Sequence, residues 1–126
     1  MNIDDITKAI VHIPVAMDER KSMSPLALLR ETGYFEVHEA ISEGILQKAI
    51  REGPEYIHEW LEYSADKRTK EGPYVQERAG EFVVGRYSAA EGLDAVEHFK
   101  DPIEATARFI KVEIESMRSH AQGRKQ

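Results

Sequence analysis

Hydrophobic positions in the first half of the chain recur three or four residues apart, which is the spacing of one buried face of an α-helix. The first such set is Ile3, Ile6, Ile10 and Ile13. We expect a helix over residues 3–13 that stops at Pro14, because proline lacks the amide hydrogen that a helix interior needs. The polar residues 17–23 then predict a loop.

Paired start and stop signals predict two further helices before residue 54. Ser24 can cap the first helix, with Pro25 at its first position, and Gly33 can end it. Ser42 and Gly53 bound the second helix in the same way. A serine side chain accepts a hydrogen bond from an otherwise unpaired amide at a helix start, and glycine adopts the backbone that often follows a helix end.

The helix that begins at Pro54 has two different faces. Its apolar face is Ile57, Trp60, Leu61 and Ser64, flanked by Tyr56 and Tyr63. Its other face carries Glu55, His58, Glu59, Glu62 and Asp66, again three or four residues apart. The basic residues that follow are Lys67, Arg68 and Lys70. Because cations favour the negative end of a helix dipole, we interpret this basic cluster as a helix end and not as a nucleic-acid site.

The pattern changes after Gly72-Pro73 to short runs rich in β-branched and aromatic residues. Residues 74–78 and 81–87 predict two strands joined by a tight turn at Ala79-Gly80, where glycine permits a positive φ. Residues 93–99 predict a third strand, with a short helix as the alternative. The candidate capping box for that alternative helix is Ser88 and Glu91.

The chain then returns to a helical pattern. Asp101, Pro102 and Glu104 form a strong helix start. The apolar seam that follows is Ile103, Ala107, Ile110, Ile114 and Met117. We expect this helix to lie across the sheet and the tail, 119–126, to fray. The predicted fold is a single α+β domain, 1–126, of four or five helices with a small antiparallel β-meander packed against the C-terminal helix; whether 1–23 pack on the core or stay peripheral is left open.

Composition and charge narrow the classes of function. The 126 residues are 41% hydrophobic and 32% charged and include no cysteine, so disulfides and zinc–thiolate sites are excluded. The first 66 residues hold thirteen acidic against six basic residues, net −7, whereas 67–126 hold ten against eleven, net +1. Such an acidic first half repels nucleic acid and anionic lipid and attracts basic partners. The sequence shows neither a signal peptide nor an apolar run of membrane-spanning length, and we expect a cytoplasmic protein.

Candidate catalytic chemistry is sparse. His38-Glu39 and His58-Glu59 each lack the second histidine of an HExxH zinc motif, and the chain has neither a nucleophile elbow nor a phosphate-binding glycine loop. We therefore predict no metal, no cofactor and no catalytic residue. The catalytic alternative is an enzyme that uses a histidine–carboxylate pair. Its candidate pairs are His58 with Glu62, and His98 with Asp94 or Asp101.

The acidic face of the Pro54 helix is the strongest candidate for binding. Like charges along one helix side cost some tenths of a kcal/mol each, and folding does not require them. Carboxylates beside aromatic side chains can steer and anchor a basic partner, so we expect one or more of the three aromatics to be partly exposed. The candidate partner-binding residues are Glu55, Tyr56, His58, Glu59, Trp60, Glu62, Tyr63 and Asp66.

Several stretches in a fixed order resemble a pattern of small bacterial proteins. These stretches are WLEYSADKR, a glycine-containing turn before Tyr74, EFVVGRY and DPIEATARFIKVEIESM, together covering roughly residues 42 to 118. Some proteins with this pattern resemble immunity proteins of polymorphic toxin systems of the contact-dependent inhibition type. The chain departs from the pattern at Gly72-Pro73-Tyr74, where Gly-Trp-Tyr is expected. The resemblance implies a non-enzymatic protein that blocks a toxin, often a basic nuclease, inside the cell that makes both.

The sequence thus favours a non-enzymatic acidic binding protein, an immunity protein that occludes a cognate basic toxin. Two alternatives stay open: a structural or scaffold domain, and a small enzyme that uses a histidine–carboxylate pair. The sequence also leaves open a homodimer formed through the C-terminal helix.

Overall fold

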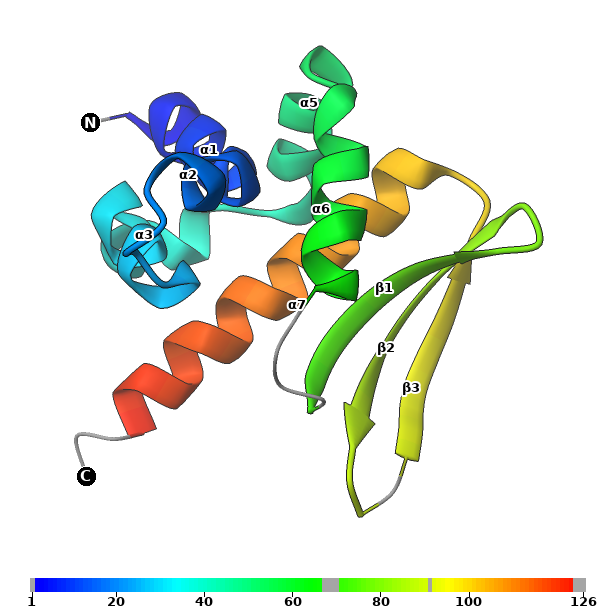
Figure 1. Cartoon of the computed structure of the whole chain (residues 1–126). Coiled ribbons are helices and arrows are strands. Elements are labelled where there is room, and N and C mark those ends of the chain that lie inside the picture. The colour runs from blue at the N-terminus through cyan, green and yellow to red at the C-terminus, as the bar shows by residue number, and fades with distance from the viewer. Residues whose placement is uncertain (1, 67–70, 91, 124–126) are drawn as a thin grey trace.

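The computed structural model describes residues 2–66, 71–90 and 92–123. They form seven α-helices, one 3-10 helix and three strands (Figure 1). In chain order these are α1 (Ile3–Val11), α2 (Ile13–Glu19), α3 (Pro25–Thr32), α4 (Tyr34–Val37), the 3-10 helix η1 (His38–Ala40), α5 (Glu43–Glu52), α6 (Glu55–Ala65), β1 (Gly72–Arg78), β2 (Glu81–Ser88), β3 (Gly92–Phe99) and α7 (Pro102–Gly123). The predicted α+β class is confirmed, with more helices than the four or five expected.

The three strands form one antiparallel sheet in the order β1-β2-β3. Ala79 and Gly80 make the predicted hairpin turn with φ values of 52° and 83°. Residues 93–99 belong to a strand, so the alternative of a short helix there is wrong. The register between β2 and β3 shifts next to Gly85, which places a bulge in the middle of the sheet.

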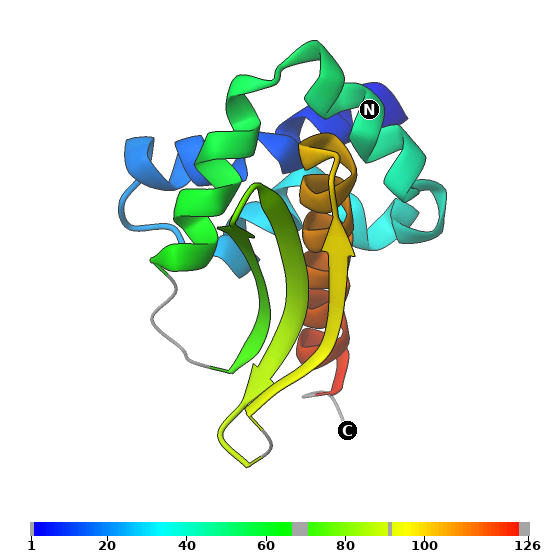
Figure 2. The same ribbon diagram turned by 90° about the vertical axis from the view of Figure 1, so that its right-hand side faces the viewer.

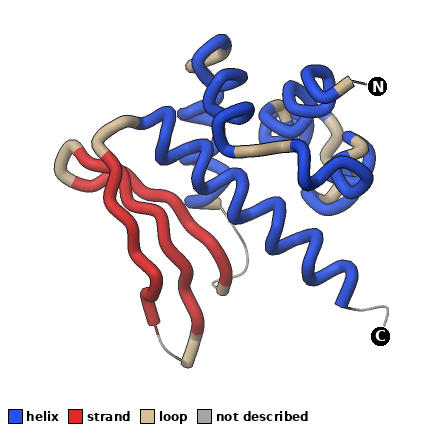
Figure 3. Tube along the Cα trace, turned by 180° about the vertical axis from the view of Figure 1, so that it is seen from behind, coloured by secondary structure: helices blue, strands red, loops and turns tan. Residues whose placement is uncertain are grey.

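Helix α7 lies across one face of the sheet, as predicted, and contacts α5, α6 and α3 on its other sides (Figures 1 and 2). Seen from behind, the strands gather on one side of α7 and the N-terminal helices on the other (Figure 3). The fully buried core includes Ile10, Leu29, Leu46, Ile50, Trp60, Phe109, Ile110 and Ile114. Burying one such side chain stabilises the fold by roughly 1.5–3 kcal/mol, so α7 supplies apolar contacts to both layers.

The predicted caps are present, and each has the expected hydrogen bond. Ser24, Ser42 and Asp101 accept hydrogen bonds from amides in the first turns of α3, α5 and α7. Gly33 follows α3 with a φ of +90°, a backbone conformation that side chains with a Cβ rarely adopt.

The N-terminal segment is part of the core and not peripheral. Its buried residues are Ile6, Ile10, Val11 and Ile13. The single helix predicted over 3–13 is interrupted at His12, and Pro14 lies in the first turn of α2 instead of ending a helix. Proline fits there because first-turn amides have no partner within the helix. As α2 continues to Glu19, the predicted loop over 17–23 is wrong for its first three residues.

The C-terminal helix is longer than expected. Helix α7 continues to Gly123, and Ala121 is buried, so the fraying predicted for 119–126 is wrong up to residue 123. The last three residues lie outside the described part of the chain. Within the described residues, no helix combines the length and apolar character that crossing a bilayer requires.

Candidate functional site

Trp60 fixes the orientation of α6. Its side chain is 0% exposed, and its indole Nε1 donates a hydrogen bond to the carbonyl oxygen of Val11 at 3.0 Å. The indole ring also packs against the rings of Tyr63 and Phe109. Trp60 is therefore a core residue, and its assignment as a partner-binding residue is wrong: the apolar periodicity that placed it on the inner face of the helix decides its position.

The side chain of Tyr63 is also fixed by a contact within the fold. Its hydroxyl donates to Oε2 of Glu113 at 2.5 Å, and the Glu113 carboxylate is itself buried. Burial, together with the negative charge of Glu113, raises the pKa of Tyr63 far above its ordinary value. The Tyr63 hydroxyl is thus engaged within the fold, and only part of its half-buried ring can meet a partner.

Tyr56 stands at the junction of α6 with the N-terminal helices. Its hydroxyl lies 2.9 Å from Nδ1 of His12, and the two rings meet edge to face. The tyrosine ring covers Gly53 so closely that a Cβ there would lie 3.0 Å from it. Burial first, and then the charges of Glu55, Glu19 and Glu59, raise the pKa of Tyr56. Tyr56 is therefore a rigid, half-exposed aromatic side chain in an acidic setting.

The acidic side chains along α6 and at its C-cap, Asp66, lie at exposed or half-buried positions, without an ion pair to any lysine or arginine that the structure describes. Glu55, Glu62 and Asp66 are exposed, and Glu59 is half-buried. Glu62 Oε1 lies 3.3 Å from Nε2 of His58 on the next turn. In the part of the chain that the structure describes, no lysine or arginine forms an ion pair with any of these four carboxylates. The predicted basic cluster at positions 67, 68 and 70 lies outside the described residues.

Several arginines of the chain are used elsewhere. Arg20 binds Glu31, Arg108 binds both Glu43 and Glu97, and Arg118 binds Glu115. These contacts stabilise the fold across α2 and α3, across α5, β3 and α7, and within α7. None of these three arginines contacts a carboxylate of α6.

A fifth carboxylate extends this surface onto α2. Glu19 Oε1 lies 3.5 Å from Nε2 of His12, whose other ring nitrogen contacts Tyr56, and the Glu19 side chain is 64% exposed. Sequence periodicity could not identify Glu19, because residues 17–23 were expected to be a loop and its proximity to α6 arises from tertiary packing. The acidic face is hereafter Glu19, Glu55, Glu59, Glu62 and Asp66.

The candidate catalytic pairs do not form an enclosed site. His98 lies 3.5 Å from Glu81 of the neighbouring strand, a partner that the sequence did not suggest. His58 and Glu62 are both well exposed on one helix turn. Neither His58 nor His98 lines the cavity between α1, α2 and α3 or the groove between β2 and α7. Among the described residues, no group of three or more His, Asp or Glu side chains could hold a metal ion.

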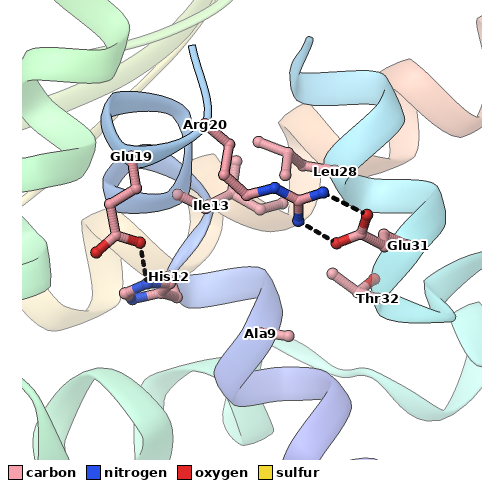
Figure 4. Close-up of a pocket in the computed structure, with 9 residues that line it drawn as sticks. Ala9, His12, Ile13, Glu19, Arg20, Leu28, Glu31 and Thr32 are labelled. Atoms are coloured by element: carbon pink, nitrogen blue, oxygen red, sulfur yellow. Dashed lines mark hydrogen bonds and ion pairs between the residues drawn. The ribbon is translucent and has the colours of Figure 1, made fainter. Parts of the chain in front are cut away.

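A cavity of about 260 Å³ opens between α1, α2 and α3 (Figure 4). It is lined by Ala9, His12, Ile13, Ala16, Glu19, Arg20, Leu28, Glu31 and Thr32. His12 and Glu19 face it from one side, and the Arg20–Glu31 ion pair bounds it on the other. The cavity shares His12 and Glu19 with the surroundings of Tyr56, so it adjoins the acidic face.

A groove of about 500 Å³ between β2 and α7 is lined mainly by polar residues. Four of them, Arg108, Lys111, Glu115 and Arg118, form hydrogen bonds or ion pairs within the fold. Lys111 Nζ donates to the hydroxyl of Tyr34 and to the carbonyl oxygens of His38 and Ile41. Hydrogen bonds from Arg118 and Tyr34 lower the pKa of Glu115 to about 2, against a partial opposing effect of burial. This network attaches α4 and η1 to α7, which is a structural role.

Comparison of the chain with protein-family models, with curated proteins and with solved structures finds no match.

Proposed function

We propose that the protein is a non-enzymatic immunity protein, which neutralises a basic toxin in the cytoplasm by covering a positively charged surface of that toxin. One observation carries the proposal: the acidic face gathers five carboxylates from α2, α6 and the C-cap of α6, and none of them forms an ion pair with a described lysine or arginine. The pattern over roughly residues 42 to 118 resembles small, uncharacterised bacterial proteins, some of which resemble immunity proteins, and this favours the same function.

Electrostatics explains why such a face would favour a basic partner. Its carboxylates repel one another, so the isolated protein gains nothing from their proximity. A cationic surface that docks on them removes this repulsion, and the long-range attraction raises association rates by about 10- to 1000-fold at low salt.

Tyr56 gives the acidic face a fixed contact point. Its position is set by Gly53, by the edge-to-face contact with His12 and by the hydroxyl contact with the His12 ring. An aromatic side chain that is already immobile loses little entropy on binding, which is why tyrosine is frequent among residues that dominate interface energies.

The proposal is tested by reversing charges on α6. Under the proposed function, the candidate toxin is the protein encoded by the gene next to this one. The double variant Glu59→Lys/Glu62→Lys should associate with it at least tenfold more slowly, and the association rate should depend less on salt, because electrostatic steering is lost. Stopped-flow or surface-based association kinetics at two salt concentrations measure both effects.

The matched control is Glu36→Lys/Glu77→Lys, which changes the net charge equally at exposed residues on α4 and β1. It should bind almost as fast as the unmodified protein. Equal slowing by both double variants would show that net charge alone acts, and unchanged binding by the α6 variant would exclude this face.

A further inference from the structure

The cavity between α1, α2 and α3 has an apolar floor and a charged rim. Ala9, Ile13, Ala16 and Leu28 supply the apolar part of its lining, and the two alanines have short side chains that take up little of the space. The remaining lining includes the polar ring of His12 and the charged groups of Glu19, Arg20 and Glu31, which Figure 4 shows on two sides of the cavity. The cavity therefore suits a side chain with an aliphatic stem and a polar end.

The charges on the rim select the sign of that polar end. Arg20 and Glu31 form a two-point ion pair, with nitrogen–oxygen distances of 2.5 and 3.0 Å, and so neutralise each other. Glu19 Oε1 lies 3.5 Å from Nε2 of His12, and among the described residues no lysine or arginine forms an ion pair with Glu19. Because Arg20 and Glu31 offset each other, the carboxylate of Glu19 sets the sign of the charge on the rim. Glu55 and Glu59 act together with Glu19 on Tyr56, the side chain that contacts His12. An anionic group would be repelled here, and a cationic one attracted.

The geometry points to this cavity as the anchor site for a single arginine or lysine side chain of the basic protein partner, an inference that rests on the proposed function. The stem would lie on Ala9, Ile13 and Ala16, and the charged head would reach Glu19 at the rim. Long basic side chains commonly bury their stems on apolar surface while the head stays among polar groups.

The size of the cavity fits one side chain better than a free metabolite. Sites for small molecules usually enclose about 300–1000 Å³, whereas this cavity offers about 260 Å³. Interfaces between proteins often concentrate their binding energy where one buried side chain enters a pocket.

The first experiment needs no partner. Nα-acetyl-L-arginine amide is titrated into the protein, with the isosteric, uncharged Nα-acetyl-L-citrulline amide as the matched probe, and the methyl signals of Ala9 and Ala16 are followed by NMR. The arginine probe should shift both methyl signals with a millimolar, saturable curve, and the citrulline probe should bind at least fivefold more weakly. The Glu19→Gln variant should lose most of this difference. Absence of shifts at the two methyl groups, or equal binding of the two probes, would overturn the inference.

The second experiment separates this inference from the proposed function. Ala16→Leu fills the cavity without changing charge, at a partly exposed helical position that accepts leucine. It should weaken binding of the adjacent gene product at least tenfold through faster dissociation, with an unchanged circular dichroism spectrum. Wild-type binding by Ala16→Leu, combined with impaired binding by Glu59→Lys/Glu62→Lys, would refute the anchor cavity and leave the proposed function standing.

Discussion

At the scale of single residues, two buried tyrosines differ in whether the hydroxyl has a hydrogen-bond partner. This difference decides what the hydroxyl contributes to the stability of the fold. The hydroxyl of Tyr34 donates to Glu115 and accepts from Lys111. The hydroxyl of Tyr74 is buried over Gly85 and has no hydrogen-bond partner among the described residues. A paired buried hydroxyl stabilises a fold, whereas an unpaired one carries the cost of its lost hydration.

Substituting phenylalanine should therefore destabilise the fold at Tyr34 and not at Tyr74. Tyr34→Phe should lower the free energy of unfolding by about 1.5–3 kcal/mol, because it removes hydrogen bonds to two charged groups. Tyr74→Phe should change it by less than about 0.5 kcal/mol or increase it. Urea unfolding followed by circular dichroism measures both values, and equal destabilisation by the two variants would contradict the assignment.

The lowered pKa of Glu115 makes the stability of the fold depend on pH. Its pKa lies at about 2 in the folded protein, against an ordinary value of 4.5. The unfolded chain therefore binds the proton more readily, so the contribution of Glu115 is complete above about pH 4.5 and is lost as the pH falls toward 2. Because the side chain is one third exposed, we expect solvent screening to limit this contribution to about 1–2 kcal/mol.

The variant Glu115→Gln isolates that contribution. Its deficit in unfolding free energy, relative to the unmodified protein, should be largest near pH 7 and should shrink between pH 4.5 and pH 2. Urea unfolding at a series of pH values tests this, and a deficit that stays constant with pH would show that the charge of Glu115 does not act in this way.

At the scale of elements, a side-chain hydrogen bond joins α6 to the edge of the sheet. Ser64 Oγ accepts a hydrogen bond from the amide of Val75 at 2.9 Å, so an amide on the outer edge of β1 is satisfied by a helix instead of a strand. This contact explains why a serine lies at a position where the apolar face of α6 would otherwise continue.

Ser64→Ala should cost about 1 kcal/mol of unfolding free energy and should increase hydrogen exchange at the Val75 amide, because that amide loses its acceptor. Ser116→Ala on α7 is a suitable control for the loss of a serine hydroxyl. Unchanged exchange at Val75 in the Ser64 variant would mean that another group replaces the hydroxyl.

Cap and turn residues in the sequence predicted the bounds of helices and strands well where both a start and a stop residue, or a complete turn, were present. Ser42 with Gly53, the Ala79-Gly80 turn and the start at Asp101 all identified real boundaries, because each is set by neighbouring residues. The prediction that Pro14 ends a helix is wrong, because the missing amide hydrogen that excludes proline from a helix interior is tolerated in a first turn. Whether a proline ends one helix or begins the next therefore depends on tertiary packing.

At the scale of the whole molecule, the candidate site was only half predictable. Helical periodicity correctly placed Glu55, Glu59 and Glu62 on one side of α6, yet it could not show that Glu19 of α2 lies near them. The same periodicity placed Trp60 on the inner face, and complete burial then removed it from the binding surface. Proximity between distant segments depends on tertiary contacts, which a single sequence does not display.

Helix α7 is made after every element that packs on it. When the chain has left the ribosome as far as Phe99, the three strands and the N-terminal helices are outside it. Helix α7, which supplies much of their shared core, is not yet outside. Nascent chains stalled there should be digested by protease, whereas those with residue 123 outside the exit tunnel should resist it. Under the proposed function, protection from the toxin would begin only with molecules whose α7 has left the ribosome, so a cell would need a reserve of such molecules before meeting the toxin.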